Sequence, residues 1–342
     1  MENKNSNWAE SLTNGQPIAQ VIAASKPADK ASTNKTSQPK PNGQLPQMHI
    51  GRGQRYGNLT WFPIWTSAPI AERDYVTAAA AGVVSVVEGS NPTVGFLQVQ
   101  NSGNKPVLLL EGALLEGGWQ HRALTRTMLV NANSTTEMPV VCVEAGRWGG
   151  VATQHLGKKS APAGVRRAMR GMSKGTNGVV YQAAADQGAV WDSVRDFSAR
   201  NNKQQATESL VGVKNELEAE LAALKLELPK PVFGQRGVLI AIGGVPLAIE
   251  VFDHPDTLAE RFETILDAYL PESLIKPFVE CRSQIARDFV ARIEKLGVEP
   301  TGDEGRLRNK ADKYVAAEAV LRGEELLHMS ALNAAHELVL VA

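Results

Sequence analysis

The chain has 342 residues with 36 basic and 36 acidic side chains, so its formal net charge is zero. A chain of this length builds one large domain or two ordinary ones. The balanced charge argues against a global field that attracts nucleic acid or an anionic membrane. The sequence contains no run of about twenty apolar residues, so no membrane span is predicted. The first residues lack the apolar stretch of a secretory signal. The two cysteines, Cys142 and Cys281, form no CxxC motif. They fit a reducing compartment, so we expect a cytoplasmic protein.

Residues 1–48 are predicted to form a disordered polar tail. Trp8 is the only aromatic residue in this segment, and Lys, Asn, Ser, Pro and Gln dominate residues 25–47. Such a composition buries too little apolar surface to offset the entropy of ordering. We expect order to begin near Leu59 and residues 49–342 to form a single large α+β domain.

Residues 59–150 are predicted to be β-rich. Strands are expected at 59–65, 83–88, 93–100, 106–110, 123–130 and 138–144, with a turn at 90–92. Pro63 is expected to interrupt the first strand, and the alanine-rich residues 75–81 predict a short helix that stops at Gly82. The short, closely spaced strands predict a mostly antiparallel, sandwich-like arrangement.

Residues 161–342 are predicted to be helix-rich with a β-hairpin. The hairpin is expected over 237–252, where two apolar runs flank Gly243 and Gly244. Thr257 and Glu260 form a capping box that predicts the start of a helix. Other helices are expected from periodicity, followed by a second hairpin over 317–329 and a last strand over 337–341. The expected helices lie at 165–172, 181–200, 210–228 and 274–296.

Several short motifs resemble catalytic sequences without their required context. Residues 171–175 fit GxSxG, but the preceding residues are basic and helix-like where a nucleophile elbow needs an apolar strand. Residues 157–160 lack the spacing of a phosphate-binding loop. The six histidines offer no metal-ligand spacing, so no metal site is predicted and His328 and His336 are interpreted as structural. The leucine stripe over 210–228 is interpreted as core and not as an oligomer seam.

One constellation of charged residues carries two interpretations. If the segments around Arg122 and Glu144 are neighbouring strands, the two side chains share a face and can meet. The first interpretation is an ion pair that fixes strand register. The second is a polar pocket, with Arg147 as an anion clamp and Trp148 or Trp119 as a stacking platform. The adjacent Gly117 and Gly118 favour the second, because glycine lets backbone N–H groups approach a ligand.

Residues 145–185 contain no Asp or Glu but seven Lys or Arg residues. This stretch is interpreted either as a solvated basic loop or as a cap over an anionic ligand such as a phosphate or ADP-ribose group. Its basic residues are Arg147, Lys158, Lys159, Arg166, Arg167, Arg170 and Lys174.

The segments PVLLLEGALLEGGWQHR and MPVVCVEAGRW, with GVLIAIGGVPLAIEVFDHPDTL further on, carry a family resemblance. Together they resemble the ARG and Rhodanese-Phosphatase-superfamily-associated Protein domain, a bacterial family of largely unknown function. The resemblance covers roughly residues 59–270, and the family name implies association with ADP-ribosylglycohydrolases. Trp119 and His121 depart from the pattern. The matching positions are Glu111, Gly112, Gly118, Gln120, Arg122, Cys142, Glu144, Gly146, Arg147 and Trp148.

The sequence thus predicts a domain that binds a small anionic or nucleotide-derived ligand in an ADP-ribose- or NAD-linked context. If it is an enzyme, the expected chemistry is hydrolysis with Glu111 or Glu144 as general base. The alternative is a non-catalytic protein-interaction module whose charged motif residues are structural. A pocket lined by the motif residues favours the former, and mutual pairing favours the latter. Cofactor and oligomeric state are not indicated. The expected ligand-binding residues are Glu111, Gly118, Gln120, Arg122, Glu144, Arg147 and Trp148.

Overall fold

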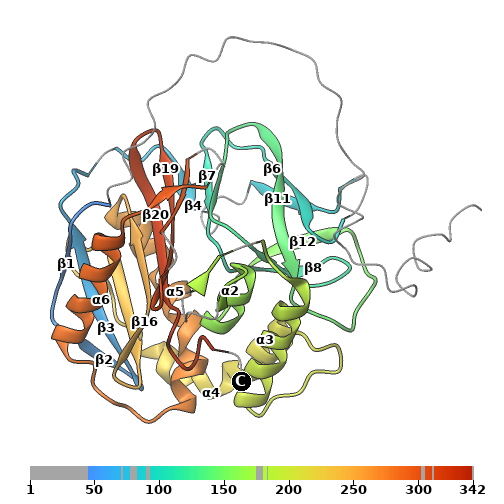
Figure 1. Cartoon of the computed structure of the whole chain (residues 1–342). Coiled ribbons are helices and arrows are strands. Elements are labelled where there is room, and N and C mark those ends of the chain that lie inside the picture. The colour runs from blue at the N-terminus through green and yellow to red at the C-terminus, as the bar shows by residue number, and fades with distance from the viewer. Residues whose placement is uncertain are drawn as a thin grey trace, which may run out of the picture. The chain divides into compact units, whose positions relative to one another are not determined.

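The computed structural model describes residues 45–340, except residues 71, 78–82, 90–92, 175–179, 183, 302–304 and 310–311. These residues form two main strand systems, a nine-stranded sheet and a closed six-stranded barrel, together with five helices. In Figure 1 the strands of the sheet lie on one side of the view and those of the barrel on the other. The predicted α+β class and the mostly antiparallel strands are confirmed.

The nine-stranded sheet is antiparallel throughout, and helices pack on both of its faces. Its interior strand β15 is buried at every position, as expected when neither face of a sheet meets water. Helix α6 packs on one face and α5 on the other. The order is β1 (Met48–Ile50), β3 (Leu59–Thr66), β15 (Gly237–Ile242), β16 (Val245–Phe252), β20 (Glu325–Asn333), β19 (Val315–Arg322), β18 (Arg306–Arg308) and β17 (Glu299–Pro300), with β2 (Gln54–Tyr56) also on β3.

Both predicted hairpins are confirmed, but the expected break at Pro63 is wrong. Gly243 and Gly244 turn β15 into β16 with φ of +62° and +80°, and β19 turns into β20 at Gly323. Strand β3 runs through Pro63 without a break. The carbonyl of Pro63 faces Gly51, in the gap between β1 and β2. The N–H that proline lacks would point to the same gap, so no ladder hydrogen bond is lost.

The β-rich half forms a closed barrel instead of the expected sandwich. Two strands close it by changing partners along their length: β11 pairs first with β6 and then with β9, and β12 pairs with β5 and then β8. A three-stranded sheet of β4 (Val76–Thr77), β7 (Val107–Leu109) and β10 (Met128–Val130) contributes Val107, Leu109 and Val130 to the same apolar core. The barrel strands are β5 (Val84–Val87), β6 (Phe96–Asn101), β8 (Ala113–Gly117), β9 (Arg122–Leu124), β11 (Ser134–Cys142) and β12 (Thr153–Ser160).

The prediction of a helix-rich C-terminal half is not confirmed, because β15 to β20 of the large sheet belong to it. The described helices do all lie in that half. Helix α5 contacts both β12 of the barrel and β15 and β16 of the sheet. A short pair of strands, β13 (Ser173–Lys174) and β14 (Val180–Tyr181), precedes α3. The helices are α2 (Ala163–Met169), α3 (Gln187–Arg200), α4 (Leu210–Leu226), α5 (Pro255–Ile275) and α6 (Ser283–Leu296).

The helix boundaries correct three sequence predictions. Helix α5 is capped by His254, whose side chain accepts a hydrogen bond from the backbone N–H of Asp256, so the expected capping box at Thr257 is wrong. The apolar run 274–296 belongs to two helices, because Pro277 disfavours a helical Lys276 before it. Helix α3 begins behind Asp186, which caps it, and Tyr181 belongs to a strand, so the expected helix start at Tyr181 is wrong.

The chain ends and one connection also differ from the predictions. Met48 is buried in β1 and its N–H donates to Glu294 at 2.6 Å, so a tail boundary at residue 48 and order from Leu59 are wrong. Val76 and Thr77 form a strand and not the expected helix, and residues 337–340 form turns and not the expected strand. The rest of the tail (1–44), residues 78–82, the turn at 90–92, Gly175 of the GxSxG match and residue 341 lie outside the described residues.

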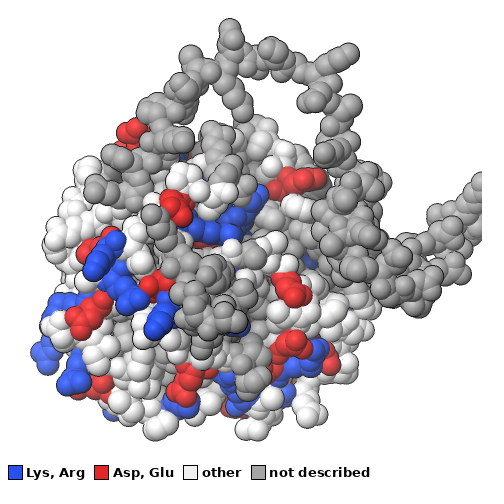
Figure 2. Space-filling model, in the orientation of Figure 1, with Lys and Arg blue, Asp and Glu red and all other residues white. Residues whose placement is uncertain are grey.

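Charges on the visible surface are mixed, and the described helices are not membrane spans. Figure 2 shows basic and acidic side chains interspersed on the face in view, which agrees with the zero net charge. Every helix in the described part of the chain is too short or too polar to cross a membrane. Both cysteines are buried and free.

Helices α2 and α5 meet through a buried carboxyl group. Glu272 of α5 is 3% exposed, and the N–H groups of Ala163 and Gly164 at the start of α2 hydrogen bond to it. Burial nevertheless raises the pKa of Glu272 to about 8 from its ordinary value of 4.5. The folded chain therefore holds this proton to a higher pH than the unfolded chain does.

We expect the Glu272→Gln variant to lose part of the pH dependence of stability. A raised pKa contributes stability that is complete below about pH 4.5 and is lost as the pH rises towards 8. The free energy of unfolding, measured in urea from pH 5 to 9, should therefore fall less steeply in Glu272→Gln than in wild type. Glu263→Gln, at an exposed position of α5, is the control. Parallel pH profiles for wild type and Glu272→Gln would contradict the assignment.

Candidate functional site

Glu111 lies in a tight turn between β7 and β8, and two arginines hold it. Its Oε1 accepts from Arg170 Nε at 2.7 Å, and its Oε2 accepts from Arg170 Nη2 at 2.5 Å and Arg166 Nη2 at 3.1 Å. The next residue, Gly112, has φ of +84°, which favours glycine. Burial by itself raises the pKa of Glu111, but Arg170 and Arg166 outweigh it and lower the pKa to about 2. Glu111 is thus ionised and poorly suited as a general base near neutral pH.

The same arginines reach the large sheet. Arg166 Nη1 donates to Glu250 Oε1 at 2.6 Å and to the Tyr269 hydroxyl at 2.8 Å. Ser330 Oγ accepts from Arg166 and Arg170, and His328 Nε2 lies 2.8 Å from Glu250 Oε2. Burial raises the pKa of Glu250, but Arg166 and His328 outweigh it and lower the pKa. A single buried network therefore joins the β7–β8 turn, α2, α5 and the sheet.

The interpretation of residues 145–185 as a solvated basic loop is wrong for the two arginines of this network. Arg166 and Arg170 are 3% and 1% exposed. Arg166 lies in α2 and Arg170 is the C-cap residue one turn later, so both side chains point to the same side of the helix. Lys159, by contrast, is partly exposed near Glu116 and Glu218.

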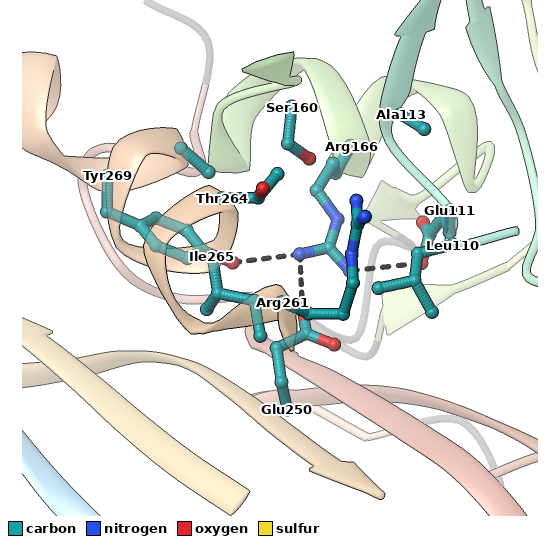
Figure 3. A pocket seen from close by; sticks show the side chains of 11 residues that line it. Leu110, Glu111, Ala113, Ser160, Arg166, Glu250, Arg261, Thr264, Ile265 and Tyr269 are labelled. Carbon is teal, nitrogen blue, oxygen red and sulfur yellow. Dashed lines mark hydrogen bonds and ion pairs between the residues drawn. The ribbon is translucent and has the colours of Figure 1, made fainter. Parts of the chain in front are cut away.

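A small cavity opens beside Arg166, and Arg261 of α5 lines it. The cavity has a volume of about 20 Å³, enough for one or two water molecules. Figure 3 shows the guanidinium group of Arg261 next to that of Arg166, with the hydroxyls of Ser160 and Thr264 at the same cavity. Arg261 is 7% exposed, and among the described residues its side chain makes no hydrogen bond or ion pair. Burial lowers the pKa of Arg261.

The cavity offers hydrogen-bond donors and positive charge. The Nε atoms of Arg166 and Arg261 are buried without a partner among the described residues. The carboxylates that border or approach the cavity, Glu111 and Glu250, already accept from Arg166, Arg170, Ser330 and His328. Three guanidinium groups thus lie near two carboxylates, and Arg261 pairs with neither of them. An anion is the group that would complete this arrangement.

Other motif residues gather at the opposite end of β8, roughly 17 Å away along a five-residue strand. Gln120, Arg122 and Cys142 are buried there. Arg122 Nη1 donates to Gln120 Oε1 at 2.8 Å and contacts the Cys142 sulfur. Glu88 lies 4.0 Å from Arg122 Nη2. Burial raises the pKa of Cys142 to about 11, so the thiol is protonated and a weak nucleophile.

Glu144 and Arg122 have different partners, so the structure does not bring them together as the expected ion pair. Glu144 Oε1 accepts from the Thr207 hydroxyl at 2.7 Å, and Oε2 accepts from the His121 N–H and Arg147 Nε, both at 3.0 Å. Burial raises the pKa of Glu144, but the hydrogen bonds from Arg147, His121 and Thr207 lower it overall. Gln120 lies between Arg122 and the backbone of Glu144. Its Oε1 accepts from Arg122, and its Nε2 donates to the Glu144 carbonyl at 2.9 Å.

Searches of curated proteins and of solved structures found no match. The family model of the ARG and Rhodanese-Phosphatase-superfamily-associated Protein domain matches residues 47–332. The chain belongs to this family.

In this member of the ARG and Rhodanese-Phosphatase-superfamily-associated Protein domain family, Arg147 holds two loops together. Besides Glu144, it donates to the carbonyls of Gly118 at 2.7 Å and Gly117 at 3.1 Å. The N–H of Gly149 donates to the Trp119 carbonyl at 3.2 Å. The donors that were expected to clamp an anion are thus bonded to the chain itself. The indoles of Trp119 and Trp148 remain 41% and 58% exposed.

Gly118 is required by its surroundings. Its φ is +59°, and an added Cβ would lie 1.8 Å from Nε2 of Gln154. That amide donates to the carbonyl of Gln120 at 2.9 Å. Close packing within the barrel therefore accounts for this glycine.

His121, Ser209 and Glu144 are close together without forming a catalytic triad. The Ser209 hydroxyl and Glu144 Oε2 lie 2.9 Å and 3.2 Å from the same ring nitrogen, Nδ1. A triad needs the hydroxyl and the carboxylate on opposite ring nitrogens. Ser209 also caps α4 by accepting from the N–H of Gly212, which gives it a structural role.

Arg261 and Glu250 were not identified from the sequence, although each is a charged residue at an apolar position of its element. Leu258, Arg261, Phe262 and Ile265 follow the spacing of one helix face, so Arg261 occupies an apolar position. Glu250 interrupts the apolar strand 245–252. A charge at such a position indicates a buried partner or a site.

We expect Glu111→Gln to destabilise the protein by roughly 3–5 kcal/mol, because it leaves buried arginines without their carboxylate. Glu116→Gln is the matched control on β8, where the side chain is 35% exposed and 4.0 Å from Lys159. Its cost should stay below about 1 kcal/mol. Urea unfolding of the two variants measures the difference, and equal costs would contradict the structural role of Glu111.

Proposed function

We propose that this protein binds a small anionic ligand whose charged group enters the cavity beside Arg166 and Arg261. The observation that carries the proposal is the buried guanidinium of Arg261, which is 7% exposed and has no hydrogen bond or ion pair within the described part of the chain. Burying an unpaired charge is costly, and a bound anion removes that cost. The Ser160 and Thr264 hydroxyls provide further donors at the same cavity.

The size of the cavity limits what enters it. A volume of about 20 Å³ admits a carboxylate or part of a phosphoryl group, while the body of a larger ligand stays outside. We extend the proposal to a nucleotide-derived ligand in an ADP-ribose- or NAD-linked context, and to a cytoplasmic protein. This extension depends on the association that the family name expresses and on the sequence. The proposal concerns binding and includes no reaction.

We expect Arg261→Met to abolish anion binding without destabilising the ligand-free protein. Methionine fills similar space and removes an unpaired buried charge, so in chloride buffer the variant should be as stable as wild type or more stable. Inorganic phosphate and ADP-ribose should give saturable heats in isothermal titration with wild type, and none with Arg261→Met. Tighter binding of ADP-ribose than of phosphate would support the nucleotide-derived ligand.

Arg287→Met, at an exposed position of α6, is the matched control and should bind like wild type. Thermal unfolding in sulfate gives a second measurement, but sulfate stabilises proteins in general. The quantity compared is therefore the difference in melting temperature between wild type and Arg261→Met at each sulfate concentration. Equal responses of the two proteins, with no binding of phosphate or ADP-ribose to wild type, would refute the proposal.

A second candidate function is a non-catalytic interaction module. The observation that favours it is the pair of exposed indoles, Trp119 and Trp148, on loops that Arg147 joins. Tryptophan is frequent among the residues that dominate protein interfaces. In this candidate the charged motif residues shape the loops, and the indoles contact a protein partner.

We expect Trp148→Ala to cost less than about 1 kcal/mol in stability, because its side chain is exposed. Trp61→Ala, at 1% exposure, should cost roughly 3–5 kcal/mol. Partner capture from a bacterial lysate, quantified by mass spectrometry, should be lost in Trp148→Ala and kept in Phe233→Ala, whose side chain is 99% exposed. A stability loss in Trp148→Ala close to that of Trp61→Ala would show that Trp148 is a core residue.

A further inference from the structure

A larger pocket lies at one end of the nine-stranded sheet. Its volume is about 240 Å³, more than that of an engineered core cavity of about 150 Å³ that holds benzene. The ends of β3 and β16, strand β18 and the turn between β19 and β20 surround it. Most of its wall is apolar and comes from Leu45, Pro46, Ala68, Pro69, Phe252, Val298, Leu307, Leu321 and Leu326.

The basic side chain of this pocket is already bonded to the chain. Arg236 is 3% exposed, and its guanidinium donates to the carbonyls of Ala68, Pro69 and Asp253 at 2.8, 3.1 and 2.9 Å. Arg236 therefore closes the wall of the pocket, and its donors are directed to the backbone and not to a ligand.

The acidic side chains of the pocket keep some acceptor capacity. Asp253 accepts from the Tyr75 hydroxyl and from the backbone N–H groups of Asp253 and His254, and a carboxylate has about four lone-pair sites. The Thr66 hydroxyl, which also lines the pocket, is buried without a hydrogen-bond partner among the described residues. Glu324 and Glu325 are exposed at the turn that borders the pocket. Three carboxylates thus surround an apolar space whose one arginine is bonded to backbone carbonyls.

We propose that this pocket binds a small amine with an apolar body. The apolar part fills the space against Phe252 and Leu326, and the ammonium group donates to Asp253 and the Thr66 hydroxyl. The rim carboxylates favour a cation electrostatically. The charge preference is opposite to that of the cavity at Arg261, so this proposal does not depend on the proposed anion site.

Hexylamine, hexanol and hexanoate test the proposal, because they share one apolar body and differ in charge. Titrations of the full-length protein are followed by isothermal calorimetry at constant ionic strength and pH 7. We expect saturable binding of hexylamine, about tenfold weaker binding of hexanol, as the loss of a charge-assisted hydrogen bond implies, and no binding of hexanoate. Asp253→Asn should remove the preference for the amine over the alcohol.

Leu326→Trp fills the pocket and should abolish binding of both hexylamine and hexanol. Leu226→Trp, at a position 89% exposed on α4, is the matched control and should leave binding unchanged. If Asp253→Asn fails to fold, Thr66→Val and the double variant Glu324→Gln/Glu325→Gln test the same preference. Hexanoate binding as tight as hexylamine binding, absence of hexylamine binding, or hexylamine binding that persists in Leu326→Trp would overturn the proposal. Arg261→Met should bind hexylamine like wild type, which separates this pocket from the anion site.

Discussion

The pairing of Glu111 with Arg166 and Arg170 is the interaction on which the arrangement of the chain depends. Glu111 comes from the turn before β8, the arginines from α2, and their further partners from β16, β19 and β20. Charges buried this deeply destabilise the fold unless each has a partner. The network therefore fixes the positions of barrel, helix and sheet relative to one another. Apolar contacts are less directional and specify these positions less strictly.

Most motif residues of this family member bind other parts of the same chain. Glu144 and Arg147 form hydrogen bonds that join loops. Gly118 leaves the space that the Gln154 side chain occupies. Arg122 contacts Gln120, Cys142 and Glu88. These polar residues are thus paired mainly within the chain, although Arg122 Nε and both carboxylate oxygens of Glu88 make no hydrogen bond among the described residues. Among the described residues, the groups proposed to meet a ligand or partner are the guanidinium of Arg261, the indoles of Trp119 and Trp148, and the pocket at the end of the sheet.

The two cavities differ in charge and are in physical contact through the core. At the smaller one Arg261 adds an unpaired positive charge beside the paired Arg166, Glu111 and Glu250, whereas Asp253 and two rim glutamates outnumber Arg236 at the larger one. Phe252 of the larger pocket stacks on His328, with ring centroids 4.7 Å apart, and His328 bonds to Glu250 of the network. The two proposed ligands therefore differ in charge although their cavities border one core.

The sequence by itself determined the α+β class, both hairpins and most helices, because hydrophobic periodicity and turn residues act over a few neighbours. It also identified Glu111 as a residue of interest. Only the tertiary structure decided the barrel closure, the partner of each charge and the unpaired state of Arg261. Arg166 lies 55 residues from Glu111 and 84 from Glu250. Such pairings depend on how distant segments pack, and no local pattern records that packing.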